Sequence, residues 1–496
     1  MMRITLVLLL TASLSFPAWA QPPDLAGRSR AAAAAMQDGR FDEAARMYQE
    51  LLEALPDEPG LLMNLGMALA MAGREAQAIA PLERAVALNP KLLPAHLFLG
   101  SSYLARGDVS KAIASLERVV AATPDDIESR RMLAQAFAAA GRTTDVVTQV
   151  RRVTEIAPKV PGAWHALGHA YNAVTQEALA TFEEEPEDSP WRQLLVADAL
   201  FADGRFTDPF ALYRAALERL PSMVSIHDSI ARIYEQTGHK DWAVQERSRG
   251  TLPAAACVKR KALCEFRAGR HRAALVAALP GTDRESRYWR VRAANELALE
   301  AFKRLEALPD SRERREVRAT LARAQRRYVD AIAELKAALA LAPGDPELLD
   351  DLGTSYYSAR DFEQAVTTLE PVLRQDPEDV RLLTVYGDSL LQLQRIDEAL
   401  KFLGRAVQLD PSNSMARLTL GRAYVQKGDF ASAIPLIEPH LAEDHDGSLH
   451  AQLARAYSGT DQREKAGALL ERSQEIQRAA QERADTVAER TITPPD

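Results

Sequence analysis

Aromatic residues and glycine are scarce in this chain of 496 residues, with aromatics at 6% and only 24 glycines. Sheet proteins favour β-branched and aromatic residues, so this shortage predicts helix almost throughout. Long apolar runs are absent beyond the first twenty residues, and no later segment approaches the roughly 18 residues of a membrane-spanning helix. Apolar residues still make up 47% of the chain, which excludes a disordered protein. The composition predicts an all-α chain of several domains, or a structure that grows by addition.

Cysteine is almost absent, with Cys257 and Cys264 as the only two. On one continuous helix their Cα atoms would lie about 10.5 Å apart, which exceeds the roughly 7 Å that a disulfide tolerates. A bridge therefore requires Cys257 to lie outside the helix, and Pro253 just upstream makes this feasible. The sequence leaves two alternatives open: a disulfide between these cysteines, or two free and partly buried thiols. The spacing differs from that of a thiol oxidoreductase motif, so redox catalysis is not indicated.

The usual catalytic motifs are missing as well. The chain has no Gly-x-Ser-x-Gly elbow, no phosphate-binding loop and no dinucleotide-binding glycine motif after a strand. His165 and His169, four residues apart on one expected helix, form the one pair with metal-ligand spacing. No third ligand is evident, so a metal-dependent enzyme is kept only as an alternative. We expect a non-enzymatic protein without a metal or cofactor.

The first twenty residues differ from the rest of the chain. Arg3 precedes an apolar run from Ile4 to Leu14, and Ala18-Trp19-Ala20 has the small-x-small pattern of a cleavage site. This pattern predicts a signal peptide over residues 1–20, with a retained membrane anchor as the alternative. No cysteine lies near the cleavage site, so a lipoprotein is not indicated. We expect an exported protein, in a bacterial periplasm or secreted, that is not transmembrane after cleavage.

What the chain does contain is a repeat. Prolines recur at intervals of 34 residues, at positions 56, 90, 124 and 158 and again at 343, 377 and 411. Within each 34-residue unit, places 4, 7, 8 and 11 return to one face of a first helix, as in Leu349, Leu352, Gly353 and Tyr356. A glycine often follows at place 15, where a left-handed residue ends a helix. The unit is therefore expected to be a helical hairpin.

The second helix of each unit carries an alanine and, four residues later, a large apolar residue, as at Ala365 and Leu369. These two residues share a face, and we expect them to pack on the first helix of the next unit. The closing proline ends the helix. With Leu-Gly-x-x-Tyr in the first helix, this pattern resembles the tetratricopeptide repeat. The resemblance implies a right-handed α-solenoid of stacked antiparallel helix pairs.

The resemblance covers about three quarters of the chain beyond the predicted signal peptide. Clear units are predicted at residues 25–58, 59–92, 93–126, 127–160, 190–223, 224–253, 312–345, 346–379, 380–413, 414–447 and from 447 onward. The chain is thus divided into a signal peptide (1–20), an N-terminal array of four repeats (25–160), a less regular helical part (161–311), a C-terminal array (312–480) and a capping helix end with a tail (481–496).

Two stretches depart from the pattern, because no glycine occurs between Gly168 and Gly204 or between Gly281 and Gly344. Each stretch contains a tryptophan, a Leu-x-x-Phe, a proline and an Asp-Ser. We interpret them as two copies of a non-standard helical insert and leave their helix register open.

In the resembled family, places 2, 5, 9, 12 and 13 of the first helix face a concave groove that holds a peptide or a partner helix. In this sequence these places define an N-terminal wall, which is apolar: Met63, Met67, Met71, Leu97, Ser101 and Leu104. They also define a polar C-terminal wall: Asp350, Thr354, Tyr357, Arg381, Thr384, Asp388, Arg422 and Arg455. Flexible methionines suit adaptable apolar binding, although they could equally pack against neighbouring units. The family's carboxylate clamp is absent, because Met63 and Met67 occupy its Lys and Asn places.

Charge is unevenly distributed. From Arg247 to Arg327 the chain has 21 Lys and Arg against 9 Asp and Glu, whereas the whole chain has a net charge of −8. The residues that define this basic belt are Lys259, Arg260, Lys261, Arg287, Arg290, Arg292, Arg315 and Arg318. The belt could bind an anionic polymer, or it could be a solvated surface balanced by acidic helices. Export argues against nucleic acid as the partner.

The sequence therefore predicts a non-catalytic scaffold that binds a protein or peptide in a concave groove, as an assembly or adaptor factor of the cell envelope. An adaptor for export of a polysaccharide or another anionic polymer is the alternative that the basic belt suggests.

Overall fold

A computed structural model describes residues 24–488 and 491–495 of the chain. Every regular element among these residues is a helix, and the described part contains no strand. No helix found there combines the length and the apolar character needed to cross a bilayer. The predicted signal peptide, residues 1–20, lies outside the described residues. The chain forms two compact units, and the boundary along the sequence falls between Ile156 and Ala157.

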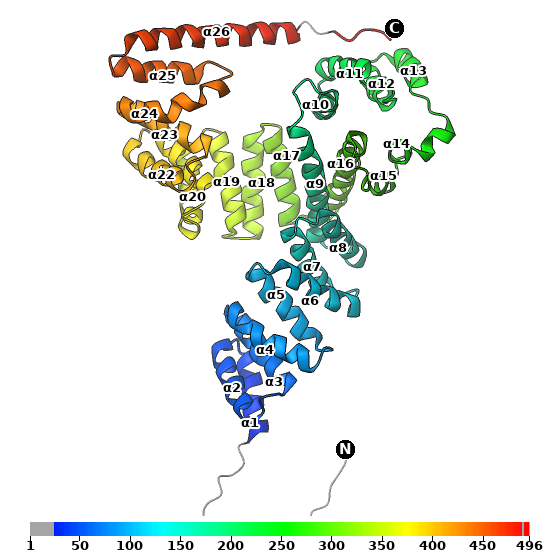
Figure 1. Cartoon of the computed structure of the whole chain (residues 1–496), viewed down its shortest axis with the longest axis vertical. Coiled ribbons are helices and arrows are strands. Elements are labelled where there is room, and N and C mark those ends of the chain that lie inside the picture. Colours follow the sequence, from blue (N-terminus) through cyan, green and yellow to red (C-terminus); the bar gives the residue numbers. More distant parts are fainter. Residues whose placement is uncertain (1–23, 489–490, 496) are drawn as a thin grey trace, which may run out of the picture. The chain divides into compact units, whose positions relative to one another are not determined.

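Unit 1 consists of four helical hairpins (Figure 1). Its helices are α1 (Leu25–Gln37), α2 (Phe41–Ala54), α3 (Pro59–Met71), α4 (Glu75–Leu88), α5 (Leu93–Ala105), α6 (Val109–Ala122), α7 (Ile127–Ala139) and α8 (Thr143–Ile156). Each helix packs on the next one along the chain, and one apolar core runs from Ala32 to Phe137. Each predicted unit of the N-terminal array thus corresponds to one hairpin.

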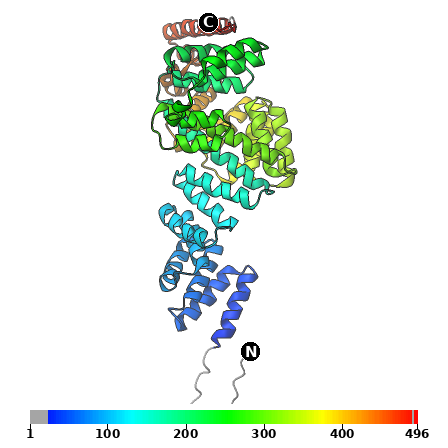
Figure 2. The same cartoon turned by 90° about the vertical axis from the view of Figure 1, so that its right-hand side faces the viewer.

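Unit 2 contains the remaining helices. They are α9 (Pro161–Glu183), α10 (Pro190–Ala202), α11 (Thr207–Arg219), α12 (Ser225–Gln236), α13 (Lys240–Arg249), α14 (Lys261–Arg267), α15 (His271–Ala278), α16 (Arg284–Glu306), α17 (Arg312–Ala324), α18 (Tyr328–Leu341), α19 (Pro346–Ser358), α20 (Phe362–Gln375), α21 (Val380–Gln392), α22 (Ile396–Leu409), α23 (Ser414–Lys427), α24 (Phe430–Ile437), α25 (Ser448–Gly459) and α26 (Arg463–Ala488). Two short 3-10 helices, η1 (Ala254–Val258) and η2 (Glu438–Glu443), follow α13 and α24. Figure 2 shows the same paired stacking from the side.

The glycine at place 8 lets the two helices of a hairpin approach each other closely. A Cβ atom added to Gly100 would lie 2.5 Å from Leu116 Cγ, and one added to Gly353 would lie 2.4 Å from Leu369 Cδ2. Any larger residue would collide with the second helix. The large residue of the second helix therefore packs on the first helix of its own unit. This corrects the expectation that it packs on the next unit.

The turn at place 15 has a left-handed backbone in every regular unit. Gly107 and Gly428 adopt φ values of 78° and 84°, as the sequence predicts. Two of the units that lack this glycine adopt the same conformation with Arg360 (φ 65°) and Gln394 (φ 60°). A side chain in this region costs roughly 1–2 kcal/mol. The turn geometry is thus imposed by the packing of the two helices.

Replacing Arg360 or Gln394 with glycine is expected to stabilise unit 2. Glycine removes the left-handed strain but also makes the unfolded chain more flexible, so we expect a net gain of about 0.5–1 kcal/mol per site. Urea unfolding followed by circular dichroism measures the change. Alanine at the same sites keeps the Cβ atom and is the control, and an equal gain from alanine would contradict the strain.

The two irregular stretches meet in the structure. Helices α9 and α16, each 23 residues long, pack along each other. A Cβ atom added to Gly168 would lie 2.3 Å from Phe302 Cε1, which is the same contact that glycine and leucine make in the regular hairpins. Trp164, Leu167 and Gly168 stand at places 4, 7 and 8 of a first helix, and Ala298 and Phe302 have the spacing of a second helix. The two helices form one repeat that is split in the sequence.

The contacts between these helices show that they run antiparallel. Beyond the Gly168–Phe302 contact, Thr175 Oγ1 donates a hydrogen bond of 3.0 Å to Asn295 Oδ1, 120 positions away. Still further along α9, Glu185 just past its end pairs with Arg284 at the start of α16. Each step forward along α9 therefore matches a similar step back along α16. The prediction of two separate inserts is corrected, because both stretches belong to one interrupted hairpin.

The residues between these two helices form a helical lobe, which we define as α10 to α15. Its hairpins are α10–α11, α12–α13 and α14–α15, and the last of these was not predicted. The lobe has its own apolar core, which includes Phe210, Tyr234 and Leu263 and continues onto Trp289 of α16. The C-terminal tail also contacts the lobe, since Tyr234 Oη donates a hydrogen bond of 2.7 Å to the carbonyl of Thr493.

Candidate binding surfaces

The N-terminal wall lies on α3 and α5 of unit 1. Met63, Leu97 and Leu104 are half-buried and pack against the unit's apolar core. Met67 and Ser101 are also half-buried, whereas Met71 at the end of α3 is 47% exposed. These side chains therefore both complete the core and present part of their apolar surface to solvent. The two interpretations of the methionines, core packing and exposed wall, each describe part of the structure.

The C-terminal wall is a hydrogen-bonded network that links α19, α21 and α23. Asp388 on α21 is 4% exposed and accepts hydrogen bonds from Tyr357 Oη at 2.5 Å and from Arg422 Nη2 at 3.3 Å. Burial raises the pKa of Tyr357, so this phenol stays a donor. Asp350 pairs with Arg381 of the neighbouring hairpin in the same way. The carboxylates of this wall are therefore already occupied by side chains of adjacent repeats.

The most exposed groups of the C-terminal wall are guanidinium groups. The side chains of Arg381 and Arg422 are 52% and 33% exposed, and Arg455 on α25 is exposed. Thr384 is buried and donates to the carbonyl of Val380 one turn back on its own helix. Arg381 and Arg422 are paired with Asp350 and Asp388, so the wall presents the outer parts of these ion pairs together with Arg455.

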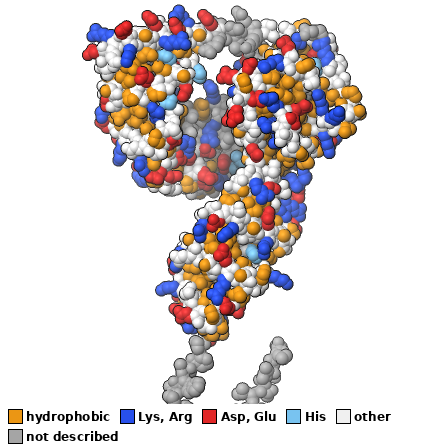
Figure 3. Space-filling model, in the orientation of Figure 1, with side chains coloured by type: hydrophobic (Ala, Val, Ile, Leu, Met, Phe, Trp, Pro, Cys, Tyr) orange, Lys and Arg blue, Asp and Glu red, His pale blue; other side chains and the backbone are white. Residues whose placement is uncertain are grey.

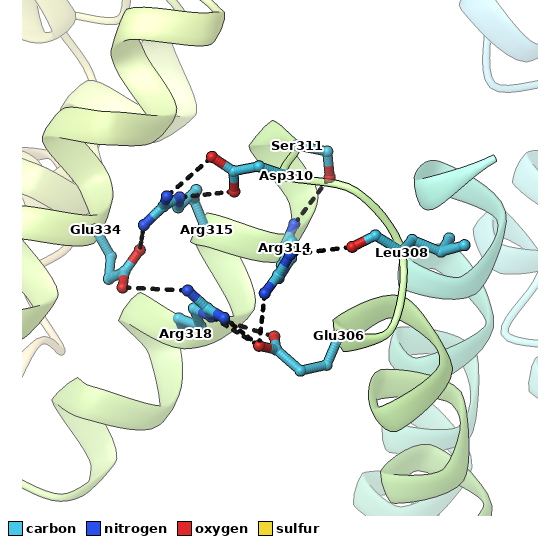
Figure 4. A network of polar contacts seen from close by, with 8 residues as sticks. All are labelled: Glu306, Leu308, Asp310, Ser311, Arg314, Arg315, Arg318 and Glu334. Carbon is cyan, nitrogen blue, oxygen red and sulfur yellow. Dashed lines mark hydrogen bonds and ion pairs between the residues drawn. The ribbon is translucent and has the colours of Figure 1, made fainter. Parts of the chain in front are cut away.

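Several arginines of the basic belt are bound to acidic side chains (Figure 4). Arg315 bridges Asp310 and Glu334, with distances of 2.8 Å from Nε to Oδ1 and from Nη1 to Oε2. Arg318 pairs with Glu306, which also accepts from Arg314 Nη2 at 3.1 Å. These contacts join the end of α16 to α17 and α18. Their role is to fix the junction between the split repeat and the C-terminal array.

Other members of the belt also face inward. Arg290 donates to the carbonyls of Ala278 and Leu279, and Arg292 pairs with Asp198 at 3.0 Å. Lys259 and Lys261 are exposed. In Figure 3 basic and acidic side chains alternate over the visible face of unit 2. The basic belt is therefore not one continuous free surface, and the sequence count overstates its positive potential.

The histidine pair lies at the junction of α9, α16 and α17. His165 Nε2 is 3.1 Å from His169 Nε2 and 3.6 Å from Glu316 Oε1. Burial, and then the neighbouring His169, lowers the pKa of His165 to about 4. Among the residues that the structure describes, no group of three or more His, Cys, Asp or Glu is arranged to hold a metal ion. The geometry thus offers a neutral imidazole pair at a packing junction.

Stability should decrease on acidification because of His165. Its imidazole titrates near pH 4 in the folded protein and near 6.5 when unfolded, so between these values only the unfolded state binds the proton. The contribution of the neutral His165 to the free energy of unfolding is therefore complete above pH 6.5 and is lost as the pH falls towards 4. About 2 kcal/mol of it is lost at pH 5. Urea unfolding at pH 7 and pH 5 measures the loss. His165→Gln should lose about 2 kcal/mol less than wild type on acidification, and an equal loss would contradict the assignment.

Cys257 and Cys264 form a disulfide. Cys257 lies in the 3-10 helix η1 and Cys264 in α14, so their Cα atoms are 5.7 Å apart. Cys257 thus lies outside the α-helix that contains Cys264, which is the condition that the sequence analysis gave for a disulfide. The bond holds the link between the second and third hairpins of the lobe.

One buried cluster was missed by the sequence analysis. Asp198 on α10 accepts hydrogen bonds from Tyr213 Oη at 2.6 Å, Tyr288 Oη at 2.9 Å and Arg292 Nη1 at 3.0 Å. Burial raises the pKa of both phenols, so they remain donors. Asp198 stands at place 9 of unit 190–223, and Arg232 holds the same place in unit 224–253. Extending the wall places to the lobe would have found both residues.

The stacked hairpins, the close glycine contact and the left-handed turn define a helical repeat protein. One tetratricopeptide repeat model matches residues 29–92 and 351–414. A second tetratricopeptide repeat model matches residues 70–136, 103–170 and 390–452. The chain is a tetratricopeptide repeat protein. Proteins of this family typically mediate protein–protein interactions and are usually not catalytic.

Solved structures of other repeat proteins resemble parts of the chain. MamA from Desulfovibrio magneticus RS-1 is 20% identical over 34% of this chain and 100% of that one, with a TM-score of 0.29. YrrB, a tetratricopeptide repeat protein with an unusual peptide-binding site, is 24% identical over 32% and 82%, also with a TM-score of 0.29. A thermophilic repeat protein from Thermus thermophilus, TTC0263, is 19% identical over 36% and 97%, with a TM-score of 0.29. No curated protein gives a significant match.

Proposed function

We propose that the protein is a non-catalytic scaffold that binds segments of partner proteins along the first helices of its repeats. The observation that carries this proposal is the division of helix α3 into two faces. In α3, Leu65 and Gly66 at places 7 and 8 are buried, whereas Met67 and Met71 at places 9 and 13 are partly or well exposed. The close contact of the hairpin with Leu82 uses the first face, and the exposed part of the second face is available to a partner.

The N-terminal wall suits an apolar segment of a partner, such as the apolar face of an amphipathic helix. Its exposed groups are thioethers and leucine side chains, which adapt to different apolar shapes. The C-terminal wall suits a polar segment that carries carboxylates, because Arg455 is exposed and the paired Arg381 and Arg422 keep part of their surface accessible. The N-terminal wall is proposed as a binding surface of unit 1, and the C-terminal wall as a binding surface of unit 2.

We further propose that the protein works outside the cytoplasm, as an assembly or adaptor factor of the cell envelope. Residues 1–20 have the charge, length and small-residue pattern of a signal peptide. The disulfide between Cys257 and Cys264 supports this location, because such bonds persist in oxidising compartments.

The alternative of an anionic polymer adaptor receives less support, because Arg290, Arg292, Arg315 and Arg318 of the basic belt are engaged by carbonyls or carboxylates. A binding assay with an anionic polysaccharide at low and high salt separates this alternative from peptide binding. Binding that persists only at low salt would reflect the remaining exposed lysines.

The test is affinity capture from an envelope extract with the chain from residue 21 onward. One variant changes Met63, Met67 and Leu97 to lysine, and a second changes only the exposed Met71 to lysine. Leu88→Lys is the matched control, because Leu88 is 46% exposed and lies on the second helix α4 rather than on the wall. We expect both wall variants to lose captured proteins that Leu88→Lys retains. Equal capture by all variants would contradict the N-terminal wall as the binding surface.

A further inference from the structure

A cavity of about 490 Å³ lies between α12, α14 and α16, at the boundary of the lobe and the split repeat. Its walls include Ser225, Arg232, Phe266, Arg267, Trp289 and Arg292. The volume falls within the range of about 300–1,000 Å³ that is usual for pockets that bind small molecules. The cavity is separate from the N-terminal and C-terminal walls.

Two buried polar atoms of the residues that line this cavity lack a hydrogen-bond partner. Trp289 is 2% exposed and Ser225 is 6% exposed, yet neither Trp289 Nε1 nor Ser225 Oγ is bonded to another group of the described residues. The large majority of buried side-chain polar atoms are hydrogen-bonded in folded proteins. An indole N–H can only donate, so the missing partner of Trp289 is an acceptor. Both atoms therefore point to a ligand that accepts hydrogen bonds.

The arginines of the cavity carry one charge that no carboxylate balances. Arg267 is paired with Asp228 at 2.7 Å, and Arg292 with Asp198 at 3.0 Å. Arg247, at the rim, is bound through both terminal nitrogens to Glu235.

Arg232 differs from these three arginines. It donates to Ser229 Oγ at 3.2 Å and lies over the Phe201 ring at 4.9 Å, and it forms no ion pair within the described ranges. Arg232 lies on α12 at place 9 of unit 224–253, one of the places assigned to the walls of the regular arrays. Its guanidinium group is thus the free positive charge of the cavity.

We propose that this cavity binds a small organic acid. Its oxyanion, a carboxylate or a phosphate, accepts hydrogen bonds from Arg232, Ser225 and Trp289. Guanidinium groups form charge-assisted hydrogen bonds with either oxyanion. Phe266, whose ring centroid lies 5.2 Å from that of Trp289, supplies an apolar surface for the body of the ligand. This inference goes beyond the proposed partner binding and does not depend on it.

Fluorine NMR of the full chain labelled with 5-fluorotryptophan tests the proposal, and Trp289→Phe identifies the Trp289 resonance. The probes are acetate, benzoate, phenyl phosphate and the neutral benzamide. We expect saturable shifts of this resonance with benzoate or phenyl phosphate at a Kd of about 1 mM or below, and none with benzamide. The response to benzoate against that to phenyl phosphate distinguishes the carboxylate from the phosphate, and acetate measures how much the oxyanion contributes alone.

Variants of the cavity complete the test. Arg232→Gln is expected to weaken binding about tenfold or more, which is about 1.4 kcal/mol, whereas Arg272→Gln, an exposed arginine on α15, should bind as wild type. Ser225→Ala removes only the hydroxyl group and should also weaken binding, so the proposal stays testable if Arg232→Gln fails to fold. No saturable shift with any oxyanion, equal binding of benzamide, or unchanged affinity in both cavity variants would overturn it.

Discussion

Replacing Gly168 with alanine is expected to destabilise unit 2 by about 2–3 kcal/mol. The added Cβ atom would lie 2.3 Å from the ring of Phe302, so α9 and α16 would have to move apart. Chemical denaturation followed by far-ultraviolet circular dichroism measures the loss. Gly162→Ala is the matched control on the same helix, because its Cβ atom would lie 3.5 Å from Glu313 Oε1, an ordinary contact. We expect the control to change stability by less than about 0.5 kcal/mol.

The same pair of residues supports a double-mutant cycle. Phe302→Ala alone should cost about 3 kcal/mol, because it removes a large apolar side chain from the contact. In the double variant the ring is gone and the alanine at position 168 has room, so the combined loss should fall short of the sum by about 1 kcal/mol or more. Additive losses would show that the two residues do not touch, and that α9 and α16 are not one hairpin.

Replacing Asp198 with alanine is expected to cost about 3–5 kcal/mol. The carboxylate accepts hydrogen bonds from two tyrosines and from Arg292, whose side chain is only 11% exposed. Without Asp198 the guanidinium group is left buried and without its counter-charge, and the lobe loses one of its polar attachments to α16. Thermal and urea unfolding measure the loss.

Asp203→Ala is the control for this prediction, because Asp203 is an exposed acid just past the end of the same helix. Its replacement should change the free energy of unfolding by less than about 0.5 kcal/mol. A loss of similar size in both variants would mean that the charge of α10 matters and the buried cluster does not.

The regular hairpins were predictable because their signals are local. The close glycine, the turn and the closing proline lie within one unit, so counting along the chain finds them. The split repeat was not predictable in this way, because its two halves are separated by the lobe. A signal does exist, since Trp164 to Tyr171 reads as a first helix and Ala298 to Phe302 as a second. Matching half-units instead of whole units would have joined them.

The exposure of the candidate binding surfaces could be predicted only in part. Most side chains at places 5, 9 and 12 of α3 and α5, such as Met67, are partly exposed or pack at the edge of the core. The same count could not show that Asp388 is buried beneath Tyr357 and Arg422, because that depends on how neighbouring hairpins cross. Net charge likewise could not show that Arg315 and Arg318 are paired, since Glu306 and Glu334 come from other helices. The sequence could not decide between a disulfide and two free thiols, because the bond depends on where α14, the helix that contains Cys264, begins.

The position of the lobe depends on α9 and α16 forming one hairpin, and photo-crosslinking tests this most directly. The side chain at position 302 is replaced with p-benzoylphenylalanine, and the linked peptides are identified by mass spectrometry after irradiation and digestion. The structure predicts attachment to the first half of α9, around Gly168 and His169, which contact the Phe302 ring. Attachment only to peptides from α15 or α17, the sequence neighbours of α16, would contradict it.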